Sequence, residues 1–268
     1  MIFHLKVVLL ILFIIVLPHS GNAANGALVP PLLIAHAAGG VKGKTYTNSL
    51  EALEENYKKG HRVFEIDFSW TSDKHLVAIH DWEVSLHSLF VVPTNITVPS
   101  KNDFFALKSK YGLVQLGMED VLDWADSKGD AYIVTDVKEN NLLALTRIAS
   151  YTKSAGNVIP QVYNYGEYYK ARDLGYKDII LTLYRMNVVP SEVVTFATEQ
   201  KPFAITMPIG AAKSGLALDL NEKGVTVYAH TINDQVTFDS LKGFGVFGVY
   251  TDFLYITQLT PPAKHPAE

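Results

Sequence analysis

Four residues in one short segment have the types and spacing of a catalytic or metal-binding site. The segment from 64 to 83 reads FEIDFSWTSDKHLVAIHDWE. Glu65 and Asp67 stand two residues apart near its start, and His80 and Asp81 stand next to each other near its end. Side chains of a β-strand alternate between two faces, so Glu65 and Asp67 point to the same side. Two carboxylates side by side in an apolar strand are costly unless positive charge neutralises them. A bound cation supplies that charge in one interpretation, and a salt bridge with a lysine supplies it in the other.

Further ionisable residues stand toward the ends of other apolar segments: His36, Asp136, Lys138, His230 and Asp252. Asp136 and Lys138 are also two apart, so they share a strand face. Each residue alone has a structural interpretation: a lone histidine packs and forms hydrogen bonds, Asp81 orients a neighbour or forms a turn, and His230 and Asp252 line a site or tie loops. Their joint occurrence at equivalent strand ends is what favours a functional site.

Eight apolar segments recur from residue 32 onward and are expected to be strands. They are LLIAHA (32–37), VFEIDFSW (63–70), AYIVTDVK (131–138), VIPQVYNY (158–165), DIILTLYR (178–185), FAITMPIG (203–210), VTVYAHTI (225–232) and FGVYTDF (247–253). Helical patterns lie between most of them, and those at 48–60 and 118–129 each end at a glycine, as helix C-termini often do. This alternation predicts an α/β fold, a single (β/α)8 TIM barrel over residues 24–268. Active sites of such barrels lie at the C-terminal ends of the strands, so the ionisable residues above should converge there.

One connection breaks the alternation and predicts an insertion after the second strand. About 45 residues separate that strand from the helix at 118, and they include a short strand at 76–80 and the polar segment 90–105. Long insertions on a barrel are more often functional or lid-forming than accidental. The tripeptide NIT at 95–97 matches a glycosylation acceptor, a pattern too short to carry an argument.

The first residues have the composition of a secretory signal peptide. Lys6 precedes the apolar run VVLLILFIIVL at 7–17, and small residues end the segment at GNA, 21–23. The run is short for a membrane span, so we expect cleavage near Ala23 and export to the periplasm or the extracellular space. An uncleaved N-terminal anchor is the alternative.

Composition excludes several classes of function. The chain of 268 residues has no cysteine, so a lipid anchor on cysteine, disulfides and thiolate metal sites are all excluded. Its formal charge of −4, with no basic block, argues against a nucleic-acid partner. The expected partner is instead a small molecule.

Several motifs in sequence order resemble one enzyme family. IAHAAGG, TNSLEAL, the segment 63–83, TDVK, HTIND (230–234) and GVYTDF (248–253) together resemble the glycerophosphodiester phosphodiesterase family, within the PI-phospholipase-C-like phosphodiesterase barrels. The resemblance covers nearly all of residues 24–268. It implies a phosphoric diester hydrolase that converts glycerophosphodiesters to an alcohol and glycerol phosphate.

The resemblance also implies a role for each matched residue. His36 and His80 match the paired acid/base histidines, and Lys138 matches a phosphate-facing lysine. Glu65, Asp67 and Asp136 match metal ligands. Asn48 matches a substrate-binding asparagine at the start of the first barrel helix, where it would also serve as the N-cap with Glu51 three residues on. Carboxylate ligands alone favour a hard divalent cation, Mg²⁺ or Ca²⁺.

Two departures from the family pattern concern the substrate more than the reaction. Ala37 stands where the family has an arginine that binds phosphate. Asp136 stands where the family has glutamate; aspartate at this position, with a lysine two residues on, is also found in the related sphingomyelinase D phospholipases. Lys42 or Lys44 could replace the missing charge; otherwise both are solvated loop lysines.

Three alternative functions remain open at this stage. The first is a phospholipase of the lysophospholipase D, PI-phospholipase C or sphingomyelinase D type, in transient contact with a membrane surface through the apolar residues Leu86, Leu89, Phe90 and Val91. The second is Schiff-base catalysis by Lys138, which the neighbouring Asp136 disfavours. The third is a non-catalytic barrel that binds phosphodiesters.

Overall fold

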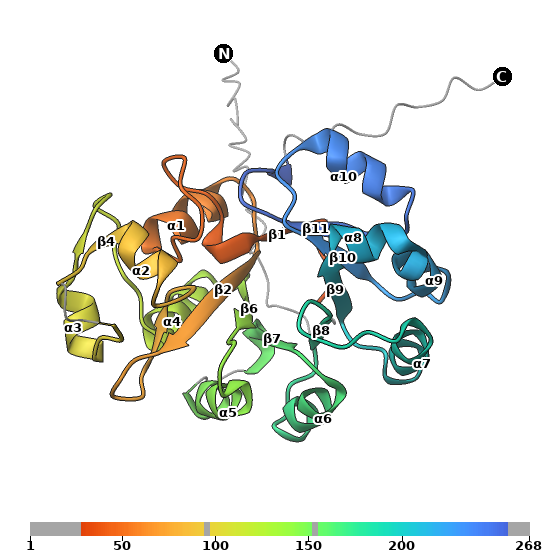
Figure 1. The fold of residues 1–268 in the computed structure, drawn as a ribbon, viewed down its shortest axis with the longest axis horizontal. Helices are drawn as coiled ribbons and strands as arrows, with labels where there is room; N and C mark the ends of the chain where they lie inside the picture. Colours follow the sequence, from red (N-terminus) through yellow and green to blue (C-terminus); the bar gives the residue numbers. More distant parts are fainter. Residues whose placement is uncertain (1–27, 94–96, 152–154, 257–268) are drawn as a thin grey trace, which may run out of the picture.

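The structure, a computed structural model, describes residues 28–93, 97–151 and 155–256, and its centre is a closed barrel of eight parallel strands (Figure 1). The strands are β1 (Leu33–Ala35), β2 (Val63–Trp70), β6 (Tyr132–Asp136), β7 (Val158–Val162), β8 (Ile180–Thr182), β9 (Ala204–Pro208), β10 (Val227–His230) and β11 (Gly248–Thr251). Each strand pairs in parallel with the next, and β1 pairs with both β2 and β11, which closes the sheet. The TIM-barrel prediction is confirmed, and each predicted segment contains one strand. The expected signal peptide lies outside the described residues.

Helices connect the strands on the outside of the barrel (Figure 1). The longer ones are α1 (Leu50–Lys58), α4 (Met118–Lys128), α5 (Asn141–Tyr151), α6 (Tyr165–Asp173), α7 (Pro190–Gln200), α9 (Ala217–Glu222) and α10 (Gln235–Lys242). Shorter pieces are η1 (His36–Ala38), η2 (Ala155–Asn157), α8 (Ile209–Ala211) and η3 (Ala212–Leu216). As predicted, α4 ends at a glycine: Gly129 is left-handed, with φ of 76°.

The alternation of side chains along β2 separates the core from the site. Phe64 and Ile66 face outward into the main core between the strands and the helices. Val63 belongs to a second apolar cluster, built from residues of all eight strands, which fills the barrel on the N-terminal side of the acids. Because the side-chain period of a strand is two, Glu65 and Asp67 must point into the barrel above Val63.

The insertion after β2 forms a small subdomain beside α1 and α4 (Figure 1). It contains β3 (Leu76–Ala78), antiparallel to β2, then α2 (Val84–Leu89), β4 (Phe90–Val91), α3 (Lys101–Ala106) and β5 (Lys108–Ser109). Leu86, Leu89 and Phe90 are buried in its own core, whereas Val91 is 56% exposed. The prediction that the first three face a lipid surface is wrong, because the short helix α2 needs its apolar side to pack against the hairpin. In the described part of the chain, no helix combines the length and the apolar character that crossing a bilayer requires.

Candidate active site

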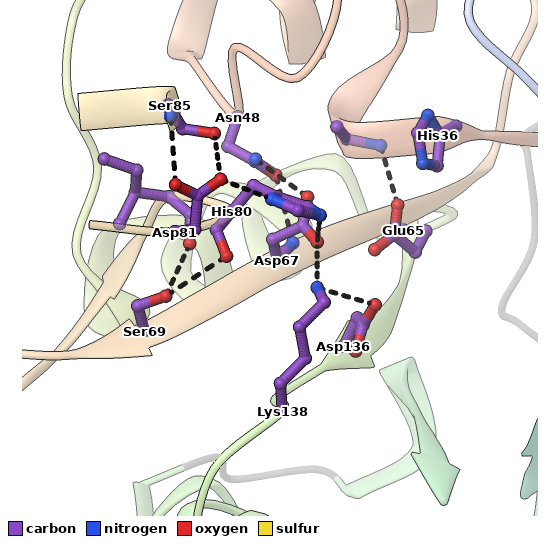
Figure 2. Close-up of polar contacts among 12 residues, drawn as sticks. His36, Asn48, Glu65, Asp67, Ser69, His80, Asp81, Ser85, Asp136 and Lys138 are labelled. Carbon is purple, nitrogen blue, oxygen red and sulfur yellow. Dashed lines mark hydrogen bonds and ion pairs between the residues drawn. The ribbon is translucent and has the colours of Figure 1, made fainter. Parts of the chain in front are cut away.

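Three buried carboxylates meet at the C-terminal mouth of the barrel (Figure 2). The parallel pairing of β2 with β6 places Asp67 opposite Asp136, and Glu65 lies one pleat earlier on the same face. Ligand atoms of Glu65, Asp67 and Asp136 all lie within 4.8 Å of one another. Among the described residues, no other three metal-ligating side chains lie this close together. The predicted convergence of strand-end residues is therefore found.

Glu65 is the carboxylate with the least compensation from the protein. Its Oε2 accepts a hydrogen bond of 2.7 Å from the backbone N–H of Ala37, which stands in a left-handed turn with φ of 48°. Burial, followed by repulsion from Asp67, raises the pKa of Glu65 to about 8. A bound cation would supply the positive charge that the protein itself does not place beside this buried carboxylate.

Lys138 compensates the other two carboxylates. Its Nζ lies 2.8 Å from Oδ1 of Asp67 and 3.1 Å from Oδ2 of Asp136. Burial alone would lower the pKa of Lys138, but the two carboxylates outweigh it and raise the pKa well above its usual value. A lysine held protonated is not a Schiff-base nucleophile, so this geometry disfavours the aldolase-like alternative.

The donor set fits a hard divalent cation. It consists of three carboxylates, and the ammonium group of Lys138 is hydrogen-bonded to two of them but not to Glu65. The set contains only oxygen ligands, which Mg²⁺ and Ca²⁺ prefer. Glu65, Asp67 and Asp136 are thus the residues that could hold such an ion.

Asn48 contacts a proposed ligand instead of capping the helix. Its Nδ2 donates to Oδ2 of Asp67 at 3.0 Å, and its Oδ1 accepts from the backbone N–H of Asp67 at 3.0 Å. The N-cap of α1 is Ser49, whose Oγ accepts from the N–H of Ala52, and the carboxylate of Glu51 accepts from Val114. The capping prediction is wrong because the backbone at Asn48 is left-handed and turns the amide toward β2.

His36 is held by a residue far away in the sequence. Its Nδ1 lies 2.9 Å from Oδ1 of Asp252, and Asn233 donates to the other oxygen of that carboxylate at 2.8 Å. Burial lowers the pKa of His36, but the hydrogen bond to Asp252 and the charges of Glu65 and Asp67 outweigh burial and raise it to about 9. Asp252 thus orients His36 and leaves Nε2 for the pocket.

His80 is held by its neighbour in the sequence. Nδ1 of His80 lies 2.7 Å from Oδ2 of Asp81, as Figure 2 shows, and Nε2 lies 4.0 Å from Oδ1 of Asp67. The other oxygen of Asp81 accepts from the backbone N–H groups of Glu83, Val84 and Ser85. Asp81 therefore fixes both the imidazole and the start of α2.

Tyr46 lies between the two histidines and had no signal in the sequence. Its ring makes edge-to-face contacts with His36, at 4.7 Å between centroids, and with His80, at 4.9 Å. The residue stands in a loop, at φ of 56°, where neither periodicity nor charge predicts a site. It keeps the two imidazoles apart across the mouth.

The remaining lining of the catalytic pocket comes from β7, β10 and β11 and from the residues that follow β8 and β10. The pocket has a volume of about 200 Å³ and is completed there by Gln161, Tyr184, His230, Thr231 and Tyr250. Burial, then the charge of His36, lowers the pKa of His230 to about 4, so this histidine is neutral near pH 7. The structure places His230 in the lining, as predicted, and Asp252 behind His36.

No loop lysine replaces the arginine that the family has at position 37. Lys42 donates to the carbonyl oxygen of Tyr111, and the ammonium of Lys44 lies 4.7 Å from the ring centroid of the same tyrosine. Neither lysine lines the catalytic pocket. Among the described residues, Lys138 is therefore the only lysine or arginine that lines the catalytic pocket.

Comparisons with known proteins agree with this geometry. Residues 39–142 match the glycerophosphoryl diester phosphodiesterase family, which confirms the resemblance seen in the sequence. No curated protein matches the chain. The similarity to the solved structures below concerns the fold alone, because each of them is less than 20% identical to this chain.

Three solved structures share the barrel. A phosphodiesterase of Oleispira antarctica, in complex with its product sn-glycerol-3-phosphate, has a TM-score of 0.64 and 16% identity over 83% of this chain and 93% of its own. A glycerophosphodiester phosphodiesterase of Parabacteroides distasonis has a TM-score of 0.62 and 17% identity over 82% and 92%.

The third is the glycerophosphodiester phosphodiesterase of Thermotoga maritima, with a TM-score of 0.59 and 19% identity over 84% of this chain and 96% of its own. Nearly the whole of each solved chain therefore corresponds to the barrel described here.

Proposed function

We propose that this member of the glycerophosphoryl diester phosphodiesterase family, a phosphoric diester hydrolase, cleaves glycerophosphodiesters to an alcohol and glycerol phosphate. The observation that carries the proposal is the meeting of three buried carboxylates with two oriented histidines in one pocket. The product held by the similar Oleispira antarctica enzyme, sn-glycerol-3-phosphate, supports release of glycerol phosphate from a glycerophosphodiester.

Glu65, Asp67 and Asp136 would hold a divalent cation, Mg²⁺ or Ca²⁺. When bound, such an ion withdraws charge from phosphoryl oxygens as the transition state forms. Lys138, fixed by Asp67 and Asp136, supplies a further positive charge for the phosphate. Asn48 orients Asp67 through two hydrogen bonds and does not need to touch the substrate.

The shape of the mouth supports different substrate sides for the two histidines. Next to His36, the pocket is lined by Tyr250 on β11 and His230 on β10, and Gln161 on β7 lines it farther around the barrel. These side chains offer hydrogen-bond partners for the hydroxyls of glycerol. The His80 side opens into wider cavities that have room for alcohols of different sizes. We therefore place the glycerol near His36 and the leaving alcohol near His80.

The chemical step then follows from these positions. The lining of the catalytic pocket contains no cysteine or serine, so the nucleophile is a hydroxyl of the glycerol adjacent to the ester. Its oxygen attacks phosphorus while His36 accepts its proton, and the bond from phosphorus to the alcohol breaks as His80 donates a proton to the departing oxygen. The product is a cyclic phosphate, which water then opens to glycerol phosphate. A hydroxyl held within the substrate gains several kcal/mol from proximity.

His36 must be neutral to accept this proton. Its raised pKa depends partly on the charges of Glu65 and Asp67. Neutralisation of those charges by a cation would leave burial, which lowers the pKa, opposed mainly by Asp252.

The test is turnover of purified protein with glycerophosphodiesters, after chelation and after addition of Mg²⁺ or Ca²⁺. We expect turnover only with the added ion, and a cyclic phosphate in the phosphorus NMR spectra of early time points. A substrate with the neighbouring hydroxyl methylated should react far more slowly. Equal rates for the methylated and free substrates would contradict attack by the glycerol, and no release of glycerol phosphate under any condition would contradict the function itself.

Export is a separate proposal that rests on residues 1–23 alone. N-terminal sequencing of the mature protein should give a start close to residue 24. A mature chain that still begins at Met1 would support the uncleaved anchor instead.

A further inference from the structure

Lys138, the proposed cation for the phosphate, lies in a loop and not on a strand. Strand β6 ends at Asp136 and α5 begins at Asn141, so Lys138 belongs to the connection 137–140. Its side chain reaches from this loop to the carboxylates of Asp67 and Asp136 (Figure 2). Among the described residues that line the catalytic pocket, no second lysine or arginine could compensate for a displaced ammonium group. What holds the loop therefore matters for the site.

The backbone carbonyl groups of this loop are bonded to donors from three different parts of the chain. Nη1 of Arg185 donates to the carbonyl oxygen of Lys138 at 2.7 Å, and Nε1 of Trp70 donates to that of Glu139 at 2.8 Å. The carbonyl oxygen of Asn140 accepts a backbone N–H of α5. Two of the three donors are thus side chains that reach the loop from elsewhere in the barrel.

Arg185 extends past the ends of three neighbouring strands to make its bond. Strands β6, β7 and β8 are neighbours in the sheet, and Lys138, Tyr163 and Arg185 follow their ends in that order. The guanidinium lies over the ring of Tyr163, 5.2 Å from its centroid, and the hydroxyl of that tyrosine donates to Asp136. A planar guanidinium can lie on a ring and donate to a carbonyl oxygen at once, whereas a lysine ammonium group has no such face.

Arg185 itself does not line the catalytic pocket. It is exposed, and it lines a separate cavity of about 460 Å³. Of the described residues, the two cavities share only Lys138. Both contacts of the guanidinium are with residues that belong to the site or bond to it: the carbonyl oxygen of Lys138 and the ring of Tyr163. Arg185 can therefore act on the reaction through these residues without touching the substrate.

We propose that Arg185 is a positioning residue for the reaction. It holds the loop 137–140 and thereby directs the ammonium group of Lys138 toward Asp67 and Asp136, where the phosphate would bind. The inference rests on the proposed function and adds to it a residue outside the catalytic pocket. Trp70 holds the same loop from the side of β2.

The first test is the pair of variants Arg185→Met and Arg185→Lys, assayed with a glycerophosphodiester and the divalent cation that supports wild-type turnover. We expect each variant to lower kcat/KM by about 10- to 100-fold, because a displacement of about 1 Å can cost about 10²-fold. Arg185→Lys keeps the charge but loses the planar group that makes both contacts. A wild-type value of kcat/KM in either variant would overturn the inference.

Arg172→Met is the matched control. Arg172 is an exposed arginine of α6 whose Nη1 donates to Oε1 of Gln200 at 3.1 Å, away from the loop. This variant should keep the wild-type kcat/KM, with all rates expressed per folded protein. Amide hydrogen exchange of residues 137–140 should be faster in Arg185→Met than in the wild type and unchanged in Arg172→Met. Unchanged exchange in Arg185→Met would show that Arg185 does not hold the loop.

A double variant tests whether Arg185 acts through Lys138. Lys138→Met should lower kcat/KM, and the addition of Arg185→Met should lower it by no more than about twofold further, because groups that act as a unit are not additive. A second loss of about 10- to 100-fold would mean that Arg185 acts by another route, and would overturn the inference. The hydrogen-exchange comparison needs no change at Lys138 and decides the matter if Lys138→Met does not fold.

Failure of this inference differs from failure of the proposed function. If Arg185→Met cleaves glycerophosphodiesters as fast as the wild type, the proposed function stands and Arg185 has no part in it. If the wild type releases no glycerol phosphate with either cation, the proposed function is wrong and the inference falls with it.

Discussion

The carboxylate of Glu65, which is proposed to bind a cation, should lower the stability of the metal-free protein. Its folded-state pKa of about 8 lies above the ordinary 4.5, so folding takes up a proton between these values and stability falls as pH rises through them. Above pH 8 the carboxylate is buried and ionised, with a single N–H of Ala37 as its hydrogen-bond donor. A carboxylate that is proposed to bind a cation thus costs stability when no cation is bound.

Replacement of Glu65 by glutamine should therefore change two properties in opposite directions. The metal-free variant should lose less stability than the wild type between pH 5 and pH 9, measured by urea unfolding with a chelator. Its affinity for Mg²⁺ or Ca²⁺, measured by calorimetry, should fall by more than the 10- to 100-fold typical of outer-sphere partners. Unchanged affinity would remove Glu65 from the ligand set.

In the chemical step, Asp81 is expected to act through His80. His80→Ala should lower kcat by about 10²- to 10⁴-fold, as loss of an acid/base group does, and His36→Ala should have a similar effect. Asp81→Asn should cost less, about 10- to 100-fold, because the imidazole remains but loses its anionic partner at Nδ1.

The double variant is the informative comparison for Asp81. Groups that act as a unit are not additive, so His80→Ala combined with Asp81→Asn should be no slower than His80→Ala alone. A further loss in the double variant would show that Asp81 has a second role. An unfolded fraction would also lower the apparent kcat without changing KM, so the folded fraction of each variant is measured and kcat is expressed per folded protein.

At the scale of elements, the insertion is expected to position His80. The turn that carries His80 and Asp81 leads directly into α2, and α2 is held by Leu86, which is fully buried in the insertion core. A cavity at Leu86 should therefore loosen the turn as well as the helix.

A matched pair of variants separates these effects. Leu86→Ala and Leu220→Ala each truncate a fully buried leucine, the second in α9 on the opposite side of the barrel (Figure 1). Each should cost about 2–5 kcal/mol in urea unfolding. Well below both melting temperatures, Leu86→Ala should lower kcat/KM and Leu220→Ala should not. Equal activities would mean that the insertion does not position His80.

The strands could be predicted from the sequence because buried parallel strands are apolar throughout and differ from the amphipathic helices. The ends of the strands could not be predicted, because the polar residues at the mouth extend each segment beyond its strand. The predicted strand 131–138, for example, stops at Asp136, and Lys138 lies in the loop that follows. The burial of Leu86 was missed for another reason. A six-residue helix has too few residues to show on which side it packs.

Most site residues could be predicted because strand ends in a barrel share one mouth. Contacts between distant segments could not: the pair of His36 with Asp252 joins residues 216 positions apart, and it closes the site where β1 meets β11. Tyr46 was missed because a loop tyrosine has no periodicity. Asn48 was predicted at the site, but its predicted capping role was wrong because side-chain capping and a turn toward β2 have the same sequence signal.

At the scale of the whole molecule, His61 links the end of the described chain to the barrel. Its Nε2 donates to the carbonyl oxygen of Leu254, which follows β11, and its backbone N–H bonds to Asn56 in α1. His61 is only 2% exposed, and its Nδ1 has no hydrogen-bond partner among residues 28–93, 97–151 and 155–256. Protonation would place a second buried N–H at that unpaired position.

His61 should therefore make the protein sensitive to acid. Burial lowers its folded-state pKa to about 4 from 6.5, so its contribution to stability is complete above pH 6.5 and is lost as pH falls toward 4. The shift corresponds to about 3 kcal/mol at most. His61→Gln keeps a donor for Leu254 but does not titrate, so the difference in unfolding free energy between variant and wild type should be constant above pH 7. As pH falls to 4, this difference should shift in favour of the variant by up to about 3 kcal/mol. His230, whose pKa is also about 4, is present in both proteins and cancels in the difference. A difference that does not vary with pH would show that His61 is not the acid-sensitive group.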